Sequence, residues 1–129
     1  MTKIFVNLPV ADVAAAREFY TGLGYTVNEE YSGEHSACMV INDAVTAMLL
    51  SHSHFSDFIS KDIADAATTT SAIFALNVDT RGEVDRVAER ALELGGGEPK
   101  APKDHGFMYV RSFSDLDGHH WELATFAQA

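Results

Sequence analysis

One carboxylate near the C-terminus, Glu122, is a candidate for a catalytic or binding side chain. It follows the sequence Asp115-Leu116-Asp117-Gly118, which is typical of a tight turn because aspartate side chains bond the nearby backbone and glycine readily takes a positive φ. The segments on either side alternate in polarity and are rich in β-forming residues, so a hairpin is predicted. On its second strand, Glu122 shares a face with His120 and points away from Trp121. Glu122 is then either a solvated surface group or part of a site.

The segment before this turn supplies further groups for acid–base chemistry. His105 precedes a glycine, and Tyr109 and Arg111 alternate along the first strand of the hairpin. These side chains could meet Glu122 at one mouth, where they would stabilise the negative charge that develops as a base removes a proton. The alternative is that Arg111 forms a surface ion pair and Tyr109 packs at a rim. We predict a catalytic set of Glu122, His105, Tyr109 and Arg111, with Glu122 as the general base.

Composition and charge limit the classes of partner. The chain has 129 residues and a formal net charge of -10, which does not favour nucleic acid or an anionic membrane, because both attract basic surfaces. The charge is compatible with a cationic ligand or with solubility alone. The single cysteine, Cys38, lies in an apolar run and is expected to be a core thiol rather than a nucleophile. With no signal sequence or membrane-spanning run in the sequence, we expect a cytoplasmic protein.

The two halves of the sequence repeat one pattern of elements. In the first half, a strand at 4–8 is followed by a helix that Asp12 caps and by strands at 25–27, 35–41 and 45–50. In the second half, a strand at 73–78 is followed by a helix with a Thr80–Glu83 capping box, a strand near Lys100 and the hairpin. This recurrence predicts one domain, residues 1–129, built from two βαβββ modules at about 1–52 and 72–127.

A linker at about 54–71 is expected to join the two modules. Its apolar residues are spaced as one stripe, which predicts a short amphipathic helix within 52–67; they are Phe55, Phe58, Ile59 and Ile63. The stripe either packs into the core or covers a site as a lid, and the core is the favoured interpretation.

Three motifs carry a resemblance to a known family. They are Asn7-Leu8-Pro9-Val10-Ala11-Asp12, Phe19-Tyr20-x-x-Leu23-Gly24-Tyr25 and Asp115-x-Asp117-Gly118-His119-x-x-Glu122-Leu123. In this order and spacing the chain resembles, over its whole length, the vicinal oxygen chelate superfamily, which includes glyoxalase I, bleomycin-resistance proteins, extradiol dioxygenases and fosfomycin-resistance enzymes. The resemblance implies an α+β fold in which two βαβββ modules form a curled mixed-sheet cup, and it implies a homodimer.

The metal site of that superfamily is not matched by the residues of this chain. In metal-dependent members one ligand comes from each of four strands, and these positions fall at Phe5, Met48, Ile73 and Glu122. Because Glu122 alone is a metal donor among them, we expect no cofactor. A divalent metal, if one binds, would need an improvised site of Glu122, His120 and His52.

Two classes of function remain open. The cup would be lined by apolar and a few polar groups, which we list as ligand-binding candidates: Phe5, Asn7, Met48, Leu50, Ile73, Phe55, Phe107 and His120. Burial there would desolvate Glu122 and make it a stronger base, which suits a glyoxalase-type lyase or isomerase acting on a small molecule. The alternative is a non-catalytic protein that sequesters a small molecule or drug. Ring-cleaving dioxygenase activity is not expected, because it needs two histidines and a carboxylate around iron.

Overall fold

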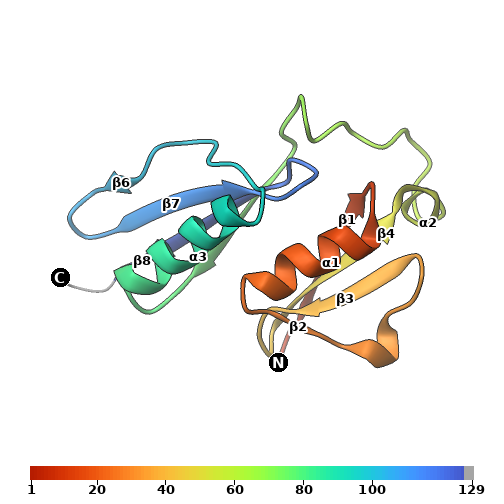
Figure 1. Ribbon diagram of the computed structural model, residues 1–129, viewed down its shortest axis with the longest axis horizontal. Coiled ribbons are helices and arrows are strands. Elements are labelled where there is room, and N and C mark those ends of the chain that lie inside the picture. The colour runs from red at the N-terminus through yellow and green to blue at the C-terminus, as the bar shows by residue number, and fades with distance from the viewer. Residues whose placement is uncertain (127–129) are drawn as a thin grey trace. The chain divides into compact units, whose positions relative to one another are not determined.

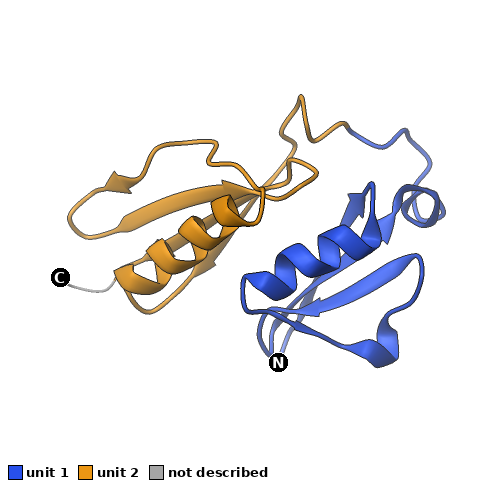
Figure 2. Cartoon of the chain, in the orientation of Figure 1, with its two compact units in different colours: residues 1–64 blue, residues 65–129 orange. Residues whose placement is uncertain are grey.

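The computed structural model describes residues 1–126 and divides into two compact units (Figures 1 and 2). The first unit is Met1–Ala64 and the second is Asp65–Ala129, and each is described by itself. The predicted end of the second module, at about 127, lies outside the described residues.

The first unit contains one mixed sheet and one long helix. Its elements are β1 (Ile4–Val10), α1 (Val13–Gly22), β2 (Thr26–Val27), the 3-10 helix η1 (Glu29–Tyr31), β3 (Ser36–Val40), β4 (Val45–Ser51) and α2 (His52–Ser56). The strand order is β1-β4-β3-β2, with β1 parallel to β4 and the other pairs antiparallel.

The second unit repeats this topology. Its elements are β5 (Ile73–Asn77), α3 (Arg81–Glu93), β6 (Lys103–Asp104), β7 (Tyr109–Ser114) and β8 (His120–Thr125). The strand order is β5-β8-β7-β6, again with one parallel pair, β5 with β8. The predicted α+β fold of two tandem βαβββ modules is therefore confirmed.

Both long helices begin where the sequence predicts. The Asp12 carboxylate accepts a hydrogen bond of 3.1 Å from the backbone N–H of Ala15, and the Thr80 hydroxyl accepts one of 3.1 Å from that of Glu83. Each cap satisfies an N–H group that has no partner inside its own helix. These two contacts fix the start of the helix that covers one face of each sheet.

Each sheet buries the face that its helix covers. In the first unit, Phe19 and Tyr20 of α1 are buried together with Leu49 of β4. In the second, the buried Trp121 ring of β8 stacks on the buried Phe113 ring of β7 at a centroid distance of 6.2 Å. The helix α3 lies along one side of this sheet (Figure 1). Burial of such apolar surface is the main stabilising term. The opposite face of the second sheet carries no helix among the described residues, whereas the short helix α2 lies near the opposite face of the first sheet, where Phe55 lines a pocket with Asn7 and Leu50.

Three predicted elements differ in extent from those observed. The helix expected within 52–67 ends at Ser56, and Phe58 and Ile59 beyond it are 71% and 37% exposed, so the predicted apolar stripe is not a buried helix face. The first strand does not stop at Pro9; β1 runs to Val10, which an edge strand permits because proline then removes no ladder bond. The strand expected near Lys100 begins at Lys103.

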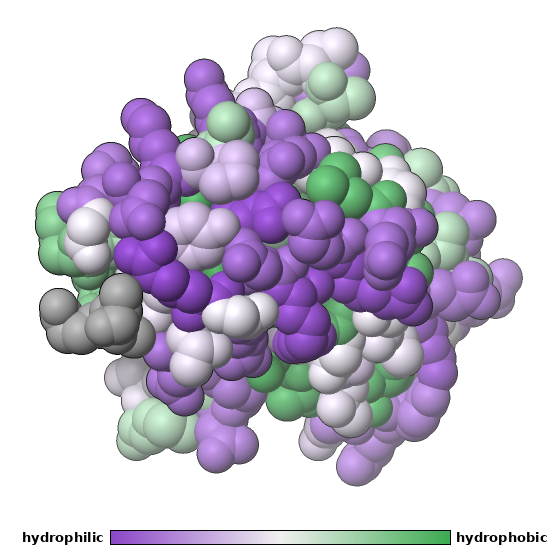
Figure 3. Space-filling model, turned by 60° about the vertical axis from the view of Figure 1, so that its left-hand side comes forward, coloured by the Kyte–Doolittle hydropathy of each residue, from purple (hydrophilic) through white to green (hydrophobic). Residues whose placement is uncertain are grey.

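The structure shows the environment of Cys38 and the polarity of one face of the surface. Cys38 is buried, and burial raises the pKa of its thiol, as expected of a core cysteine. The face drawn in Figure 3 is largely hydrophilic, in keeping with the acidic composition. Among the described residues, no helix has the length and apolar character needed to cross a membrane.

The turn between β7 and β8 is fixed by Asp115 and Gly118. One carboxylate oxygen of Asp115 accepts hydrogen bonds from the backbone N–H groups of Asp117 and His119, at 3.0 and 2.9 Å. Gly118 has φ +95, and a Cβ atom there would lie 2.5 Å from the carbonyl oxygen of Ala66. The turn therefore requires glycine both for its φ and for its contact with the neighbouring backbone.

We predict that Gly118→Ala lowers the free energy of unfolding of the second unit by about 2–4 kcal/mol, because it combines an unfavourable φ with a backbone clash. The fluorescence of Trp121, the single tryptophan, reports urea unfolding of this unit. Gly106→Ala is the matched control, since Gly106 also has a positive φ, +84, but open space around its Cβ position. Equal losses in the two variants would contradict the proposed contact with Ala66.

Candidate functional site

The register of the β7–β8 hairpin assigns its residues to two faces of the second sheet. Ser112 pairs with Glu122, and Arg111 pairs with Leu123. Because side chains alternate along a strand, Ser112 and Glu122 share one face, and Arg111 shares the other with Leu123. The second face is the buried one that α3 covers, so Glu122 lies on the face without a helix.

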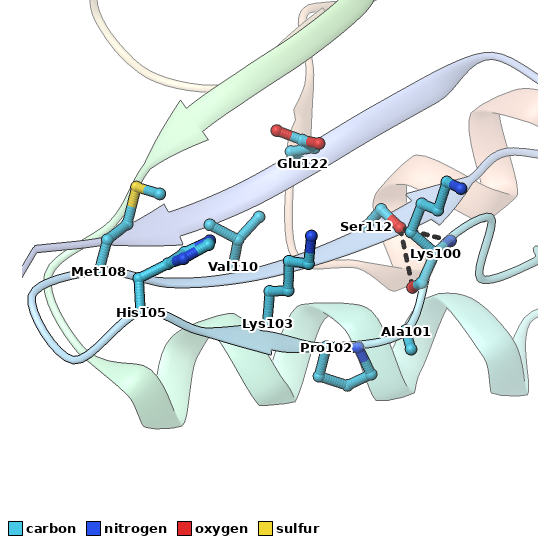
Figure 4. Close-up of a pocket in the computed structure, with 9 residues that line it drawn as sticks. All are labelled: Lys100, Ala101, Pro102, Lys103, His105, Met108, Val110, Ser112 and Glu122. Atoms are coloured by element: carbon cyan, nitrogen blue, oxygen red, sulfur yellow. Dashed lines mark hydrogen bonds between the residues drawn. The ribbon is translucent and has the colours of Figure 1, made fainter.

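A pocket of about 520 Å³ lies on this open face of the second sheet. It is lined by Lys100, Ala101, Pro102, Lys103, His105, Met108, Val110, Ser112 and Glu122. The strands β7 and β8 form its floor, and the segment 100–105 forms its wall. Figure 4 shows the side chains of Lys103, Val110 and Glu122 directed into the same space. Apolar walls with a few polar groups are the usual character of a small-molecule site.

Glu122 is the single acidic residue of this pocket. Its side chain is half-buried, and its carboxylate has no hydrogen bond or ion pair among residues 1–126. Its neighbour across the ladder, Ser112, is buried and has its hydroxyl engaged elsewhere. The carboxylate is therefore free to accept a proton or a hydrogen bond from a bound molecule.

Ser112 holds the wall of the pocket at Lys100. The backbone N–H of Lys100 donates to the Ser112 hydroxyl at 3.1 Å, and the same hydroxyl donates to the Lys100 carbonyl at 3.2 Å. A hydroxyl can donate once and accept at the same time, so both bonds form together. Ser112 thus attaches the segment before β6 to the floor of the pocket.

His105 lies in the pocket with Glu122, as predicted. It begins the tight turn between β6 and β7, in which its backbone N–H donates to the carbonyl of Met108 at 2.8 Å. The Asp104 carboxylate accepts a 2.8 Å bond from the backbone N–H of Gly106 in the same turn. Figure 4 shows the imidazole extending from this turn along the pocket.

The expected common mouth of Glu122 with Tyr109 and Arg111 does not form. Both side chains lie on the face that packs against α3. The Arg111 guanidinium is buried and donates to three carboxylates, at 2.8 Å to Glu98, 2.7 Å to Glu89 and 3.2 Å to Asp85. The physical reason is the pairing register, which places Arg111 opposite Leu123 rather than opposite Glu122.

Arg111 forms a charge cluster in which its own guanidinium is buried and its three carboxylate partners are partly exposed. Burial alone lowers the pKa of its guanidinium, but the hydrogen bonds to Glu98, Glu89 and Asp85 outweigh burial, so the pKa is raised. A buried guanidinium needs this full set of acceptors, because an unpaired charge away from water is costly. The cluster joins α3 to β7 and is a structural role for Arg111.

Tyr109 extends this cluster. Its hydroxyl donates to Asp85 at 2.6 Å, and the Arg81 guanidinium lies 5.0 Å from the centroid of its ring. Burial, together with the bond to Asp85, raises the pKa of the phenol. Tyr109 therefore remains protonated and fixed on the helix-covered face.

The predicted ligand-binding residues of the first unit lie on the sheet face opposite α1 or, in the case of Phe55, on the helix α2 beside it. Asn7, Leu50 and Phe55 line a pocket of about 390 Å³ together with Phe58 and Ile59. Met48 is opposite Asn7 in the β1–β4 ladder, and Phe5, which is 58% exposed, is two residues before Asn7 on the same face. The structure thus brings Asn7, Leu50 and Phe55 together in one pocket.

The remaining predicted residues do not line the second-unit pocket. Ile73 is 53% exposed at the start of β5, and Phe107 is exposed in the turn before β7. His120 pairs with Ile73 and shares the face of Glu122, and its Nε2 atom is buried without a partner among the described residues. His52 begins α2, in the first unit.

The residues present do not fit the metal site that the resemblance implies. Of the four ligand positions, Phe5, Met48 and Ile73 have no donor atom that a divalent ion binds. Across residues 1–126, no three His, Cys, Asp or Glu side chains gather closely enough to hold a metal ion. The set of Glu122, His120 and His52 stays a prediction.

The sequence interpretation missed Lys100, Lys103 and Ser112 as pocket residues. The turn sequence 115–118 could have identified Ser112 as a pocket residue. Once the turn is fixed, Ser112 falls opposite Glu122. For Lys100 and Lys103 the signal was weaker, because their position depends on how the segment before β7 folds over the sheet.

Comparisons with known proteins agree with this architecture. The family model described as bleomycin resistance protein-like N-terminal matches residues 2–42. A hypothetical protein from S. aureus has a TM-score of 0.82 at 26% identity, over 97% of this chain and 94% of its own. A glyoxalase/bleomycin resistance protein/dioxygenase family enzyme from Burkholderia phytofirmans PsJN has a TM-score of 0.78 at 17% identity, over 95% of this chain and 97% of its own. A fosfomycin resistance protein from Mesorhizobium loti has a TM-score of 0.70 at 18% identity, over 96% of this chain and 91% of its own. No curated protein matches the sequence.

These similarities define the class of protein. The chain has the fold of the glyoxalase/bleomycin-resistance proteins, which confirms the predicted resemblance to the vicinal oxygen chelate superfamily at the level of fold. The fold alone does not define a reaction, because one fold carries many chemistries.

We predict that Arg111→Met destabilises the second unit by about 2 kcal/mol, because it removes several charge-assisted hydrogen bonds while their acceptors remain. Arg111→Lys should recover only part of this loss, since one ammonium cannot reach three carboxylates with the geometry of a guanidinium. Urea unfolding followed by Trp121 fluorescence measures both variants.

The control for the Arg111 variants is Arg86→Gln. Arg86 also lies in the second unit, and its contact with Glu83 at 3.7 Å is exposed, so the change should cost no more than about 0.5 kcal/mol. An Arg111→Met variant as stable as this control would show that the cluster does not join α3 to the sheet.

Proposed function

We propose that the protein acts on a small organic molecule that binds in the second-unit pocket, as a lyase- or isomerase-type enzyme with Glu122 as the general base. The observation that carries this proposal is an unpaired, half-buried carboxylate that lines a pocket with mostly apolar walls. A carboxylate without a competing partner is available to accept a proton from a bound molecule.

The proposed step is removal of a proton from a carbon next to a carbonyl group. The C–H proton passes to the Glu122 carboxylate, and the electron pair of that bond moves to the carbonyl oxygen to form an enolate. Return of the proton to another atom completes an isomerisation, and loss of a leaving group completes an elimination. His105 lines the same pocket and is the proposed hydrogen-bond donor to the enolate oxygen.

Glu122→Gln is predicted to slow proton exchange by about 100-fold or more, because glutamine keeps the shape of the side chain and removes the base. The measurement is loss of C–H signals in D₂O by ¹H NMR, with the hemithioacetal of methylglyoxal and glutathione and a panel of small carbonyl compounds. His105→Asn should slow exchange less, because it removes a donor and leaves the base.

Glu18→Gln is the matched control for Glu122→Gln. Glu18 is an exposed glutamate of α1 in the first unit, and its replacement should leave the exchange rate unchanged. Equal exchange in the Glu122→Gln variant and the unchanged protein would refute the assignment of the base.

Elemental analysis for bound metal tests independently whether the side chains of this protein form a metal site. We predict that the protein, incubated with zinc, nickel, iron or manganese and then desalted, retains far less than one ion per chain by elemental analysis, because a tight site needs three or more donors. Retention of one ion that is lost in both Glu122→Gln and His120→Gln would overturn this prediction and support the improvised metal site.

A second candidate function is sequestration of a small molecule without chemistry. The observation that favours it is the pocket of about 390 Å³ in the first unit, whose lining is mostly apolar and includes the exposed Phe58. A ligand that binds the folded protein raises its melting temperature even where no reaction follows. Ligand-induced stabilisation without proton exchange or turnover would favour this function.

Homodimer formation and a cytoplasmic location are part of the same proposal. The dimer is supported by the resemblance and by the edge strands β1 and β5, which carry the exposed residues Ile4 and Ile73. Exposed apolar edge strands usually need cover. The cytoplasmic location is supported by a single cysteine that is buried and free.

A further inference from the structure

The lysines of this protein differ from its arginines in having no acidic partner. Every arginine forms an ion pair: Arg17 with Glu29, Arg81 with Asp104, Arg86 with Glu83, Arg90 with Glu93, and Arg111 with three carboxylates. The four lysines are Lys3, Lys61, Lys100 and Lys103, and none has an ion pair among the described residues. Acidic side chains outnumber basic ones in this chain, whose net charge is -10, so a basic side chain without an acidic partner is unexpected.

Two of these lysines line the same pocket as Glu122. Lys100 and Lys103 are exposed and belong to its wall, and Figure 4 shows the Lys103 side chain extending into the pocket space. With Glu122 as the single acidic group, the charged side chains of the lining sum to a positive value. The pocket is therefore a locally cationic place on an acidic protein, and a local field of this kind attracts anions.

The direction of Lys103 is fixed by its neighbour in β6. The Asp104 carboxylate accepts two hydrogen bonds from the Arg81 guanidinium, at 2.6 and 3.1 Å. Arg81 belongs to α3, on the covered face, so alternation along β6 directs Lys103 to the open face, opposite Val110. The hydrogen bonds from Arg81 and Gly106 hold the pKa of Asp104 at about 2, so this clamp persists at neutral pH and is lost only as the pH falls toward that value.

Lys100 is fixed separately, through the backbone bonds to Ser112 described above. Two independent contacts, one through Asp104 and one through Ser112, therefore fix the backbone that carries the two lysines over the sheet with Glu122. Positively charged side chains placed in this way strengthen binding when a ligand supplies the missing anion.

We propose that the second-unit pocket selects small organic anions, with Lys100 and Lys103 binding the anionic group and the apolar walls at Met108 and Val110 contacting the rest of the molecule. This inference rests on the proposed function for the pocket and adds the class of substrate: a carbon acid that also carries a carboxylate or a phosphate. Contact of the anionic group with the lysines would hold the apolar part over the sheet, beside Glu122.

Four probes with one ring and different head groups test the charge preference: benzoate, phenyl phosphate, benzyl alcohol and benzylamine. Each is titrated into the whole ¹⁵N-labelled protein, and the amide signals of residues 100–112 are followed by NMR. Benzoate or phenyl phosphate should shift these signals in the millimolar range, and the two others should bind at least about tenfold more weakly. The stronger of the two anions identifies the head group.

Lysine variants test the residues. Lys100→Gln and Lys103→Gln should each weaken binding of the preferred anion by about two- to fivefold, as expected for an ion pair near the surface, and the double variant should weaken it further. Lys103→Arg should retain most of the affinity. Lys61→Gln is the matched control, an unpaired lysine of the first unit, and should have no effect.

The outcomes separate this inference from the proposed reaction. Glu122→Gln should abolish proton exchange but keep or increase anion affinity, because it removes a like charge from the pocket. If anions bind as expected and no exchange is found, the reaction fails and the anion site stands. Equal or stronger binding of benzyl alcohol or benzylamine, unchanged affinity in the double lysine variant, or no binding by any probe would overturn the inference.

Discussion

The pairing of Ser112 with Glu122 is the constraint on which the site depends. It is set by the turn in which Asp115 accepts bonds from two backbone N–H groups and Gly118 approaches the backbone of Ala66. A shift of β8 by one residue would exchange the faces of its side chains and carry Glu122 toward α3, and the same shift of β7 would carry Arg111 away from α3. One short turn therefore determines which charged groups are structural and which are available to a ligand.

The polar and charged side chains on the two faces of the second sheet differ in whether they have partners. On the covered face, Arg111 and Tyr109 have their polar atoms engaged by carboxylates, so their charges and hydroxyls serve to join α3 to β7. On the open face, the Glu122 carboxylate and the lysine ammonium groups have no such partners among residues 1–126. Satisfied charges stabilise one conformation, whereas unsatisfied charges beside a pocket are free to interact with a bound molecule.

Much of the fold was predictable because local signals repeat in both halves. The caps at Asp12 and Thr80 and the tandem order of strands follow from residue types alone, and the structure agrees. The site was only partly predictable. Glu122 and His105 line one pocket, whereas Tyr109 and Arg111 lie on the other face, because alternation on one strand does not define its register against the next. The apolar spacing after Ser56 also suggested a longer helix, yet α2 ends at Ser56 and Phe58 beyond it is exposed.

Carboxylate footprinting tests most directly whether Glu122 is the available acid of the second sheet. Brief labelling with a carbodiimide and glycine ethyl ester, read by mass spectrometry, compares Glu122 with Glu98, which accepts two bonds from the buried Arg111. The account predicts that Glu122 is labelled well before Glu98, and that Arg111→Met increases labelling of Glu98 but not of Glu122. Rapid labelling of Glu98 with an unreactive Glu122 in the unchanged protein would contradict it.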